Sequence, residues 1–99
     1  MSNDIYLIGE VGKEITLADT IDKVNSSDGI KPLNVHIHSK GGSVYEGLAI
    51  YNYFKGLKQE VNTVSNGLVA SIASIIFLAG NKKNRIVNST DSFLIHLPT

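Results

Sequence analysis

The sequence contains no cysteine, and this absence removes several classes of function at once. Without thiols the chain forms no disulfide framework, offers no thiolate ligand to a metal and has no cysteine nucleophile. It also has no excess of one charge, because nine Lys and Arg residues balance nine Asp and Glu residues. Proteins that bind nucleic acid or anionic membranes normally use a positive field, so we expect neither kind of partner.

Long hydrophobic runs are missing as well. The most apolar stretch, residues 68–80, contains two serines. It is also shorter than the roughly 20 residues that a membrane-spanning helix needs. The first residues lack the basic start and the apolar run of an export signal. We therefore expect a cytoplasmic protein, which the lack of cysteine fits.

The composition that remains is that of an ordinary globular protein. Hydrophobic residues make up 42% of the chain and charged residues 18%, so it can bury a core. Its 99 residues are close to the length of one small domain, for which about 100–150 residues are usual. We expect a single domain over residues 1–99.

Runs of β-branched, aromatic or alternating residues predict short strands. They cover residues 5–8, 33–38, 61–65, 86–87 and 93–96. The second of these strands ends in the glycine pair Gly41 and Gly42, and the third is expected to break at Gly67.

Three helices are predicted between these strands. Thr16 is expected to cap the first, and Ser43 with Glu46 forms a capping box for the second, which continues to about residue 58. Residues 70–79 are apolar almost all round, which is typical of a buried helix.

Strands that alternate with helices predict right-handed crossovers and a largely parallel sheet covered by helices. Ligands of such folds bind where strands end and helices begin. The glycine pair at 41–42 and Ser71 both lie at strand-to-helix turns. We expect these two turns to converge on one crevice.

Ser71 is the candidate nucleophile. A serine attacks only when a base takes its proton, so it needs a fixed position and a histidine within reach. Ser71 follows Gly67, where the backbone can turn sharply, and stands at the start of the apolar helix. Free N–H groups at a helix start favour negative charge. The alternative interpretation is that Ser71 only caps the helix.

The glycine pair is a candidate for oxyanion binding. Glycine lets a backbone N–H point outward in conformations that other residues avoid. Converging N–H groups of Gly42 and Ile72 would form an oxyanion hole. The alternative is a simple turn before a well-capped helix.

Three histidines are candidates for the base. His36 and His38 alternate on one predicted strand and so point to the same face, whereas His96 ends the last strand. His96 could instead be a histidine of the core. A metal site of the three histidines would need a carboxylate or water beside them, and no acid lies at a helpful spacing, so we expect no metal.

Two other patterns carry no function in this interpretation. The basic residues 82–85 lie in a polar turn of a chain without net charge, which is typical of a solvated loop. The Gly-x-Ser-x-Gly elbow is absent around every serine, which argues against an α/β-hydrolase.

Three segments together resemble the Clp protease proteolytic subunit and its relatives, among them phage head-maturation peptidases. Residues 37–44 (IHSKGGSV) are similar to the family's Ile-Asn-Ser-Pro-Gly-Gly turn, and residues 47–51 (GLAIY) continue as its helix does. Residues 67–73 (GLVASIA) are similar to the nucleophile motif Gly-x-Ala-Ala-Ser-Met. Residues 92–98 (SFLIHLP) resemble the Met-Ile-His-x-Pro segment. Their common order makes the signal specific, and it covers most of the chain.

The resemblance implies an α/β fold of the ClpP and crotonase superfamily. This fold is built of stacked ββα units with a largely parallel sheet, here incomplete at the C-terminus. It further implies a serine endopeptidase in which Ser71 forms an acyl-enzyme and His96 is the general base. Gly42 and Ile72 would supply the oxyanion hole through their N–H groups. No metal or organic cofactor is implied.

The same resemblance implies how a substrate and partners bind. Gly41, Ser43 and Val44 would hold a peptide or an unfolded protein as an added strand. Like subunits would form a homo-oligomer. The parent protein would work with an ATP-driven unfoldase or, in the phage branch, on capsid proteins. Residues 41–52 look slightly closer to the phage branch.

Departures from the family pattern concern substrate preference and the third triad member. His38 replaces the usual Asn, Lys40 the usual Pro and Val69 an Ala. The family's aspartate follows the histidine, but this sequence stops at Thr99, and Asp91 matches no motif. We expect a truncated chain with little or no peptidase activity, since loss of such an aspartate lowers turnover by about 10⁴-fold.

Two other functions compete with the peptidase. A crotonase-like acyl-CoA hydratase or isomerase would share the fold, use an N–H pair for a thioester enolate and need no serine. A catalytically inactive assembly module would keep the fold for self-association alone.

Overall fold

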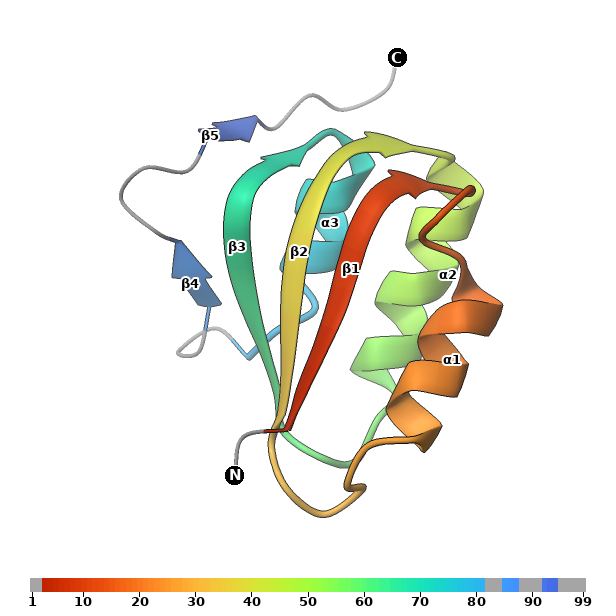
Figure 1. The fold of residues 1–99 in the computed structure, drawn as a ribbon, viewed down its shortest axis with the longest axis vertical. Helices are drawn as coiled ribbons and strands as arrows, with labels where there is room; N and C mark the ends of the chain where they lie inside the picture. Colours follow the sequence, from red (N-terminus) through yellow and green to blue (C-terminus); the bar gives the residue numbers. More distant parts are fainter. Residues whose placement is uncertain (1–2, 82–84, 88–91, 95–99) are drawn as a thin grey trace.

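A computed structural model describes residues 3–81, 85–87 and 92–94. Its strands form one sheet in the order β1, β2, β3, β4, and β5 also pairs with β3; every pairing is parallel (Figure 1). The elements in chain order are β1 (Asp4–Val11), α1 (Leu17–Asn25), β2 (Leu33–Gly42), α2 (Val44–Lys55), β3 (Val61–Ala70), α3 (Ile72–Phe77), β4 (Arg85–Val87) and β5 (Ser92–Leu94). The predicted α/β fold with a parallel sheet is confirmed.

The core lies between one face of the sheet and the helices α2 and α3, which stand behind it in Figure 1. In β1, β2 and β3, alternate residues point to this face and are buried over most of the strand, because successive side chains of a strand face opposite ways. Burying one such side chain contributes about 1.5–3 kcal/mol. The sheet and helix residues that meet there include Leu7, Leu33, Val35, Ile37, Ile50, Phe54, Ile72 and Ile76.

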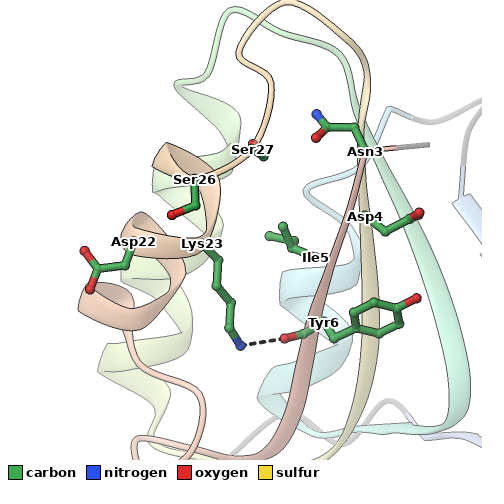
Figure 2. A pocket seen from close by; sticks show the side chains of 8 residues that line it. All are labelled: Asn3, Asp4, Ile5, Tyr6, Asp22, Lys23, Ser26 and Ser27. Carbon is green, nitrogen blue, oxygen red and sulfur yellow. Dashed lines mark hydrogen bonds between the residues drawn. The ribbon is translucent and has the colours of Figure 1, made fainter. Parts of the chain in front are cut away.

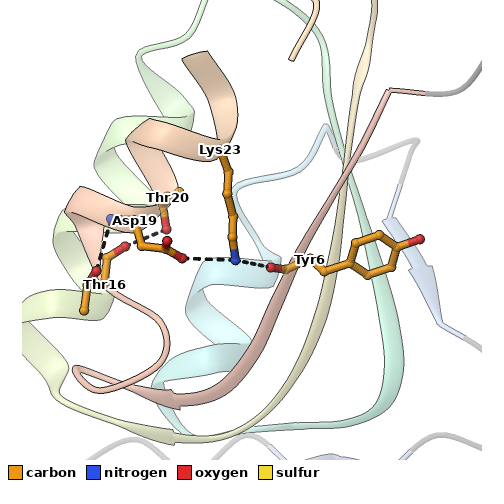
Figure 3. Close-up of polar contacts among 5 residues, drawn as sticks. All are labelled: Tyr6, Thr16, Asp19, Thr20 and Lys23. Atoms are coloured by element: carbon orange, nitrogen blue, oxygen red, sulfur yellow. Dashed lines mark hydrogen bonds and ion pairs between the residues drawn. The ribbon is translucent and has the colours of Figure 1, made fainter. Parts of the chain in front are cut away.

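Helix α1 packs outside α2 and is tied to β1 by Lys23 (Figure 3). The Lys23 ammonium donates to the Tyr6 carbonyl oxygen at 2.7 Å and forms an ion pair with Asp19 at 3.0 Å. Thr16 caps the helix as predicted, since its hydroxyl accepts from the Asp19 N–H. Thr20 is fully buried, and its hydroxyl is satisfied there because it donates to the Thr16 carbonyl oxygen.

The capping box predicted for α2 forms only in part. The Ser43 hydroxyl accepts from the Glu46 N–H at 3.3 Å, as predicted. The Glu46 carboxylate, however, accepts from the Leu17 N–H at 2.6 Å, and the Ser43 N–H donates to the Val11 carbonyl oxygen. Glu46 therefore joins the starts of α1 and α2.

Two strands continue beyond their predicted ends. β2 includes Gly41 and Gly42, and β3 passes through Gly67 to Ala70, so that α3 begins only at Ile72. The predicted break at Gly67 and helix start at residue 70 are thus wrong. These glycines have positive φ and lie beside irregularities in the pairing, where one strand carries extra residues. The irregularities bend the strands without ending them.

No described helix covers the other face of the sheet, and its residues are half-buried or exposed. His36 lies at its centre, stacked on Tyr6 with ring centroids 4.6 Å apart. Its ring nitrogens contact the Asp4 carboxylate at 2.8 Å and the Asn66 amide at 3.3 Å. Within the part of the chain that the structure describes, no helix is long and apolar enough to cross a membrane.

Candidate active site

Ser71 occupies a strained turn between β3 and α3. Its backbone has φ 55° and ψ −130°, and it is the one described residue other than glycine with a positive φ. Such a conformation costs on the order of 1–3 kcal/mol in a residue with a side chain, so the surroundings must enforce it. Strain of this kind is concentrated at functional sites, and nucleophilic serines are known to occupy sharp strand-to-helix turns.

The Ser71 hydroxyl does not cap the helix that follows. Ser71 stands at the N-cap position, but its side chain makes no capping hydrogen bond. Its carbonyl oxygen instead accepts from the N–H and the hydroxyl of Ser74, at 3.0 and 2.6 Å. The interpretation of Ser71 as a helix cap is therefore wrong, and the half-buried hydroxyl is not committed to the helix.

Gly41 brings the glycine pair directly against the serine. A Cβ atom placed on Gly41 would lie 2.8 Å from the Ser71 Cβ and 3.3 Å from its Oγ. The Ala70 carbonyl oxygen would be 3.1 Å away. A side chain at position 41 would fill the space beside the hydroxyl, so glycine is required there for access to it.

The other predicted site residues, for oxyanion and for substrate, lie at the same two turns. Gly42 packs on β1, since a Cβ there would meet the Val11 carbonyl oxygen. The Ser43 hydroxyl accepts from the Glu46 N–H and so caps α2, and the partly buried Val44 packs against the core. Ile72 is buried and touches Gly47, whose position leaves no room for a Cβ. The predicted convergence of the two turns is thus present in the fold.

Sequence reasoning missed the role of Ser39. This side chain is buried, and its hydroxyl accepts from the Gly41 N–H at 3.0 Å. The bond fixes the backbone of the residue that contacts Ser71. The only signal in the sequence was a hydroxyl at an inward position of a strand, two residues before the glycine pair.

His38 is the second residue whose role was missed. The prediction that it shares a face with His36 is confirmed, but its ring turns toward β3. There its Nδ1 accepts from the Leu68 N–H at 3.1 Å. It fills the place where pairing between β2 and β3 shifts register.

A cavity of about 400 Å³ opens beside this turn, lined in part by His38, Lys40 and Leu68. Glu10, Lys13 and Glu14 line its other side. The pKa of Glu14 lies below its ordinary value, chiefly because the Glu10 N–H donates to its carboxylate at 2.8 Å. The cavity therefore presents mixed charges close to the serine turn.

A larger cavity, of about 540 Å³, lies between the start of β1 and α1 (Figure 2). Lys23 reaches across it to the Tyr6 carbonyl oxygen. This cavity is at the opposite end of the strands from Ser71, so it is not part of the candidate site. Across the described ranges, no three His, Cys, Asp or Glu side chains are grouped closely enough to hold a metal ion.

The predicted base, His96, lies outside the described residues, as does Asp91. The chain that leads to His96 is described as far as Leu94. β5 pairs with the last part of β3, with Leu94 opposite Ala70. Ala70 directly precedes Ser71.

The family model described as Clp protease matches residues 1–99. The chain belongs to the Clp protease family. It is 37% identical over 99 residues to ATP-dependent Clp protease proteolytic subunit 2 of Borreliella burgdorferi. The aligned region covers 98% of this chain and 50% of that protein. The corresponding subunit of Treponema denticola is 36% identical over 99 residues, with the same coverage.

Solved structures of Clp proteases have the same fold as this chain. ClpP1 from Listeria monocytogenes is 30% identical with a TM-score of 0.85, over 96% of this chain and 56% of that one. The ClpP protease catalytic domain from Plasmodium falciparum is 35% identical with a TM-score of 0.84, over 95% and 55%. The chain thus spans about half the length of the curated relatives it matches.

Proposed function

We propose that this Clp protease family chain carries the nucleophile and the base of a serine endopeptidase, with Ser71 attacking the peptide carbonyl. The observation that supports this most strongly is the strained backbone of Ser71, together with a hydroxyl that makes no capping bond and faces Gly41. A fold tolerates such strain where it positions a reacting group. A cap alone would not need it.

His96 is the base in this proposal. The path of β5 supports the assignment, because Leu94 is paired beside Ala70 and His96 is the second residue after Leu94. Two residues span at most about 7 Å of chain. The imidazole would take the proton of Ser71 as it attacks and return it to the leaving amine.

The oxyanion of the tetrahedral intermediate would be bound by the N–H groups of Gly42 and Ile72. Both residues flank the contact between Gly41 and Ser71 in the chain. Backbone donors held in place before the reaction stabilise developing charge without reorganisation. Their contribution is on the order of 3–4 kcal/mol for a single donor.

A peptide or unfolded protein would bind as an extended strand along Gly41, Ser43 and Val44. Main-chain hydrogen bonds would supply affinity there, and the neighbouring cavity would take side chains. The relatives are described as ATP-dependent, so we propose an oligomer of like subunits served by an ATP-driven unfoldase. Capsid proteins are the alternative substrate for a phage enzyme.

The experiment is covalent labelling of the protein at its natural length with a fluorophosphonate, followed by mass spectrometry. We expect one phosphonate on Ser71 and none in Ser71→Ala. Ser27→Ala removes a serine hydroxyl at the end of α1 and should label as the native protein does. Hydrolysis of an unfolded protein substrate should disappear only in Ser71→Ala.

The outcomes separate the competing functions. A folded protein that never labels at Ser71 is the result expected of an inactive assembly module and would overturn the proposal. Binding of CoA, with activity kept in Ser71→Ala, is the result expected of a crotonase-like enzyme and would overturn it equally.

A further inference from the structure

The link between His38 and Leu68 is the point where β2 supports the serine turn. Pairing between the two strands is regular up to Ile37 opposite Ser65 and resumes at Ser39 opposite Val69. Between these pairs β2 carries His38 alone, whereas β3 carries residues 66–68. At such an irregularity a backbone N–H can lose its ladder partner. For the Leu68 N–H, the His38 imidazole takes the place of that partner.

The contact requires one protonation state of the ring. A backbone N–H can only donate, so the His38 Nδ1 that accepts from Leu68 at 3.1 Å must carry a lone pair. The form of the ring that makes this bond is neutral, with its proton on Nε2. Protonation of Nδ1 would place two donors face to face and break the bond.

Gly67 shows that the ring lies against the backbone of β3. A Cβ on Gly67 would lie 2.9 Å from the His38 Nδ1, and its φ of 98° suits only glycine. The residues of β3 that come after Gly67 lie alongside β2 again. Val69 pairs with Ser39, and Ser71 contacts Gly41.

We propose that neutral His38 is a positioning residue for Ser71, acting through the Leu68 N–H and the bulge of β3. The inference rests on the proposed function of Ser71. The bond holds the segment that must deliver the serine in a strained conformation. Once His38 is protonated, the bulge is held by fewer contacts and the strain at Ser71 is less well enforced.

The other charged groups around His38 do not account for loss of the bond between His38 and Leu68 on protonation. Glu10, Lys13 and Glu14 face it from the β1 side of the cavity, and Lys40 faces it from its own strand. His36 lies two residues away on the same face, whereas β3 contains no charged residue. Carboxylates and lysines titrate outside the range of about pH 5 to 8 in which histidines change charge. The response in that range can thus be assigned by substitution of the histidines.

Asparagine and glutamine at position 38 form a matched pair. Asn Oδ1 and His Nδ1 are both bonded to Cγ, so His38→Asn keeps an acceptor at nearly the same place but cannot be protonated. His38→Gln moves the acceptor one bond farther out and should not restore the contact. His36→Asn removes the neighbouring histidine and is the control for the rest of this face.

The first measurement is hydrogen exchange of residues 66–71, by mass spectrometry on the protein at its natural length. Rates are divided by the intrinsic rate at each pH. Between pH 8 and pH 5 the normalised exchange of native protein should rise about fivefold, the factor for one net hydrogen bond. It should stay flat in His38→Asn, be high at every pH in His38→Gln, and rise as in the native protein in His36→Asn.

The second measurement is the rate of phosphonate labelling of Ser71. Titration of His96 affects native protein and His38→Asn alike, so the ratio of their rates cancels it. We expect this ratio to be near one at pH 8 and to fall about fivefold by pH 5. His38→Gln should label slowly throughout.

The two measurements test the bond, the positioning of Ser71 and the proposed function separately. Exchange that is independent of pH in the native protein would overturn the inference, whatever the labelling shows. A pH-dependent exchange with a constant labelling ratio would show that the bond exists but does not position Ser71. Absence of labelling in every variant would instead count against the proposed function, while exchange still reports on the bond between His38 and Leu68.

Discussion

Gly41 lies directly against Ser71, so closely that a Cβ on the glycine would sit 2.8 Å from the serine Cβ. Gly41 lies in β2 and Ser71 in the turn between β3 and α3, 30 positions apart in the sequence (71 minus 41). Their contact places the glycine turn beside the hydroxyl. It is the relationship on which the proposed chemistry depends.

The first prediction concerns Gly41→Ala. The new methyl group must displace Ser71, and Gly41 has a φ of 110° that alanine rarely adopts. We expect the rate of phosphonate labelling to fall by about 100-fold, as for a misplacement of about 1 Å in an active site. Gly29→Ala is the control, because nothing lies within 4 Å of a Cβ there. Equal labelling of both variants would contradict the contact.

The second prediction concerns Ser39→Ala. The substitution leaves the Gly41 N–H without the acceptor that it has now, at a buried position. An unsatisfied buried donor costs about 1–3 kcal/mol, which urea unfolding should detect. Ser27→Ala is the control: Ser27 Oγ only donates, to a carbonyl that also accepts from the Ser27 N–H. A cost for Ser39→Ala no larger than for this control would show that the bond is unimportant.

The third prediction concerns the contact between α2 and α3. A Cβ on Gly47 would meet the Ile72 Cγ1 within the packed interface. Gly47→Ala should therefore push α3 away and lower the free energy of unfolding by about 1–3 kcal/mol. Gly56→Ala should be neutral or slightly stabilising, since Gly56 has φ −84° and a Cβ there has only ordinary contacts. A neutral Gly47→Ala would mean that the helices separate freely.

The fourth prediction concerns Glu14 and acid. Its pKa is lowered in the folded chain, chiefly by the hydrogen bond from the Glu10 N–H. A lowered folded pKa contributes stability above the unfolded value, about 4.5, and this contribution is lost as the pH falls through the folded value. Glu14→Gln keeps an acceptor oxygen but does not titrate.

The variant should therefore be less stable than the native protein at pH 7, and the difference should shrink toward pH 3. Urea midpoints of both proteins at the two pH values measure it. A difference that is the same at pH 7 and at pH 3 would contradict the assignment of the shift to Glu14.

Local patterns were sufficient for much of the fold. The alternation in residues 33–38 predicted the strand and its buried face, and Thr16 and Ser43 were found as caps because a cap depends on neighbours in the sequence. The order of the three motifs indicated the Clp protease family, and the family model confirms it. The strand ends at Gly42 and Ala70 were not predicted, because bulges depend on the partner strand.

The residues of the candidate site also fall into those that local patterns predict and those that depend on another strand. Ser71 and the glycine pair could be singled out from residue type and spacing, but not the roles of Ser39 and His38, whose partners are Gly41 and Leu68. The role of Ser39 could not be predicted because its hydroxyl is buried, and the neighbouring sequence does not show which N–H it accepts from. For His38 the reason is register, since its partner lies 30 residues away.

The sequence by itself determined which elements form and which residue types are present for chemistry, because helix caps, strand alternation and turn glycines act over a few neighbouring positions. Only the tertiary structure decided that β2 holds the segment of β3 before Ser71, through His38, Ser39 and Gly41. The physical reason is that a strained backbone and a bulge are stable only when contacts from another strand enforce them, and those contacts depend on three-dimensional register.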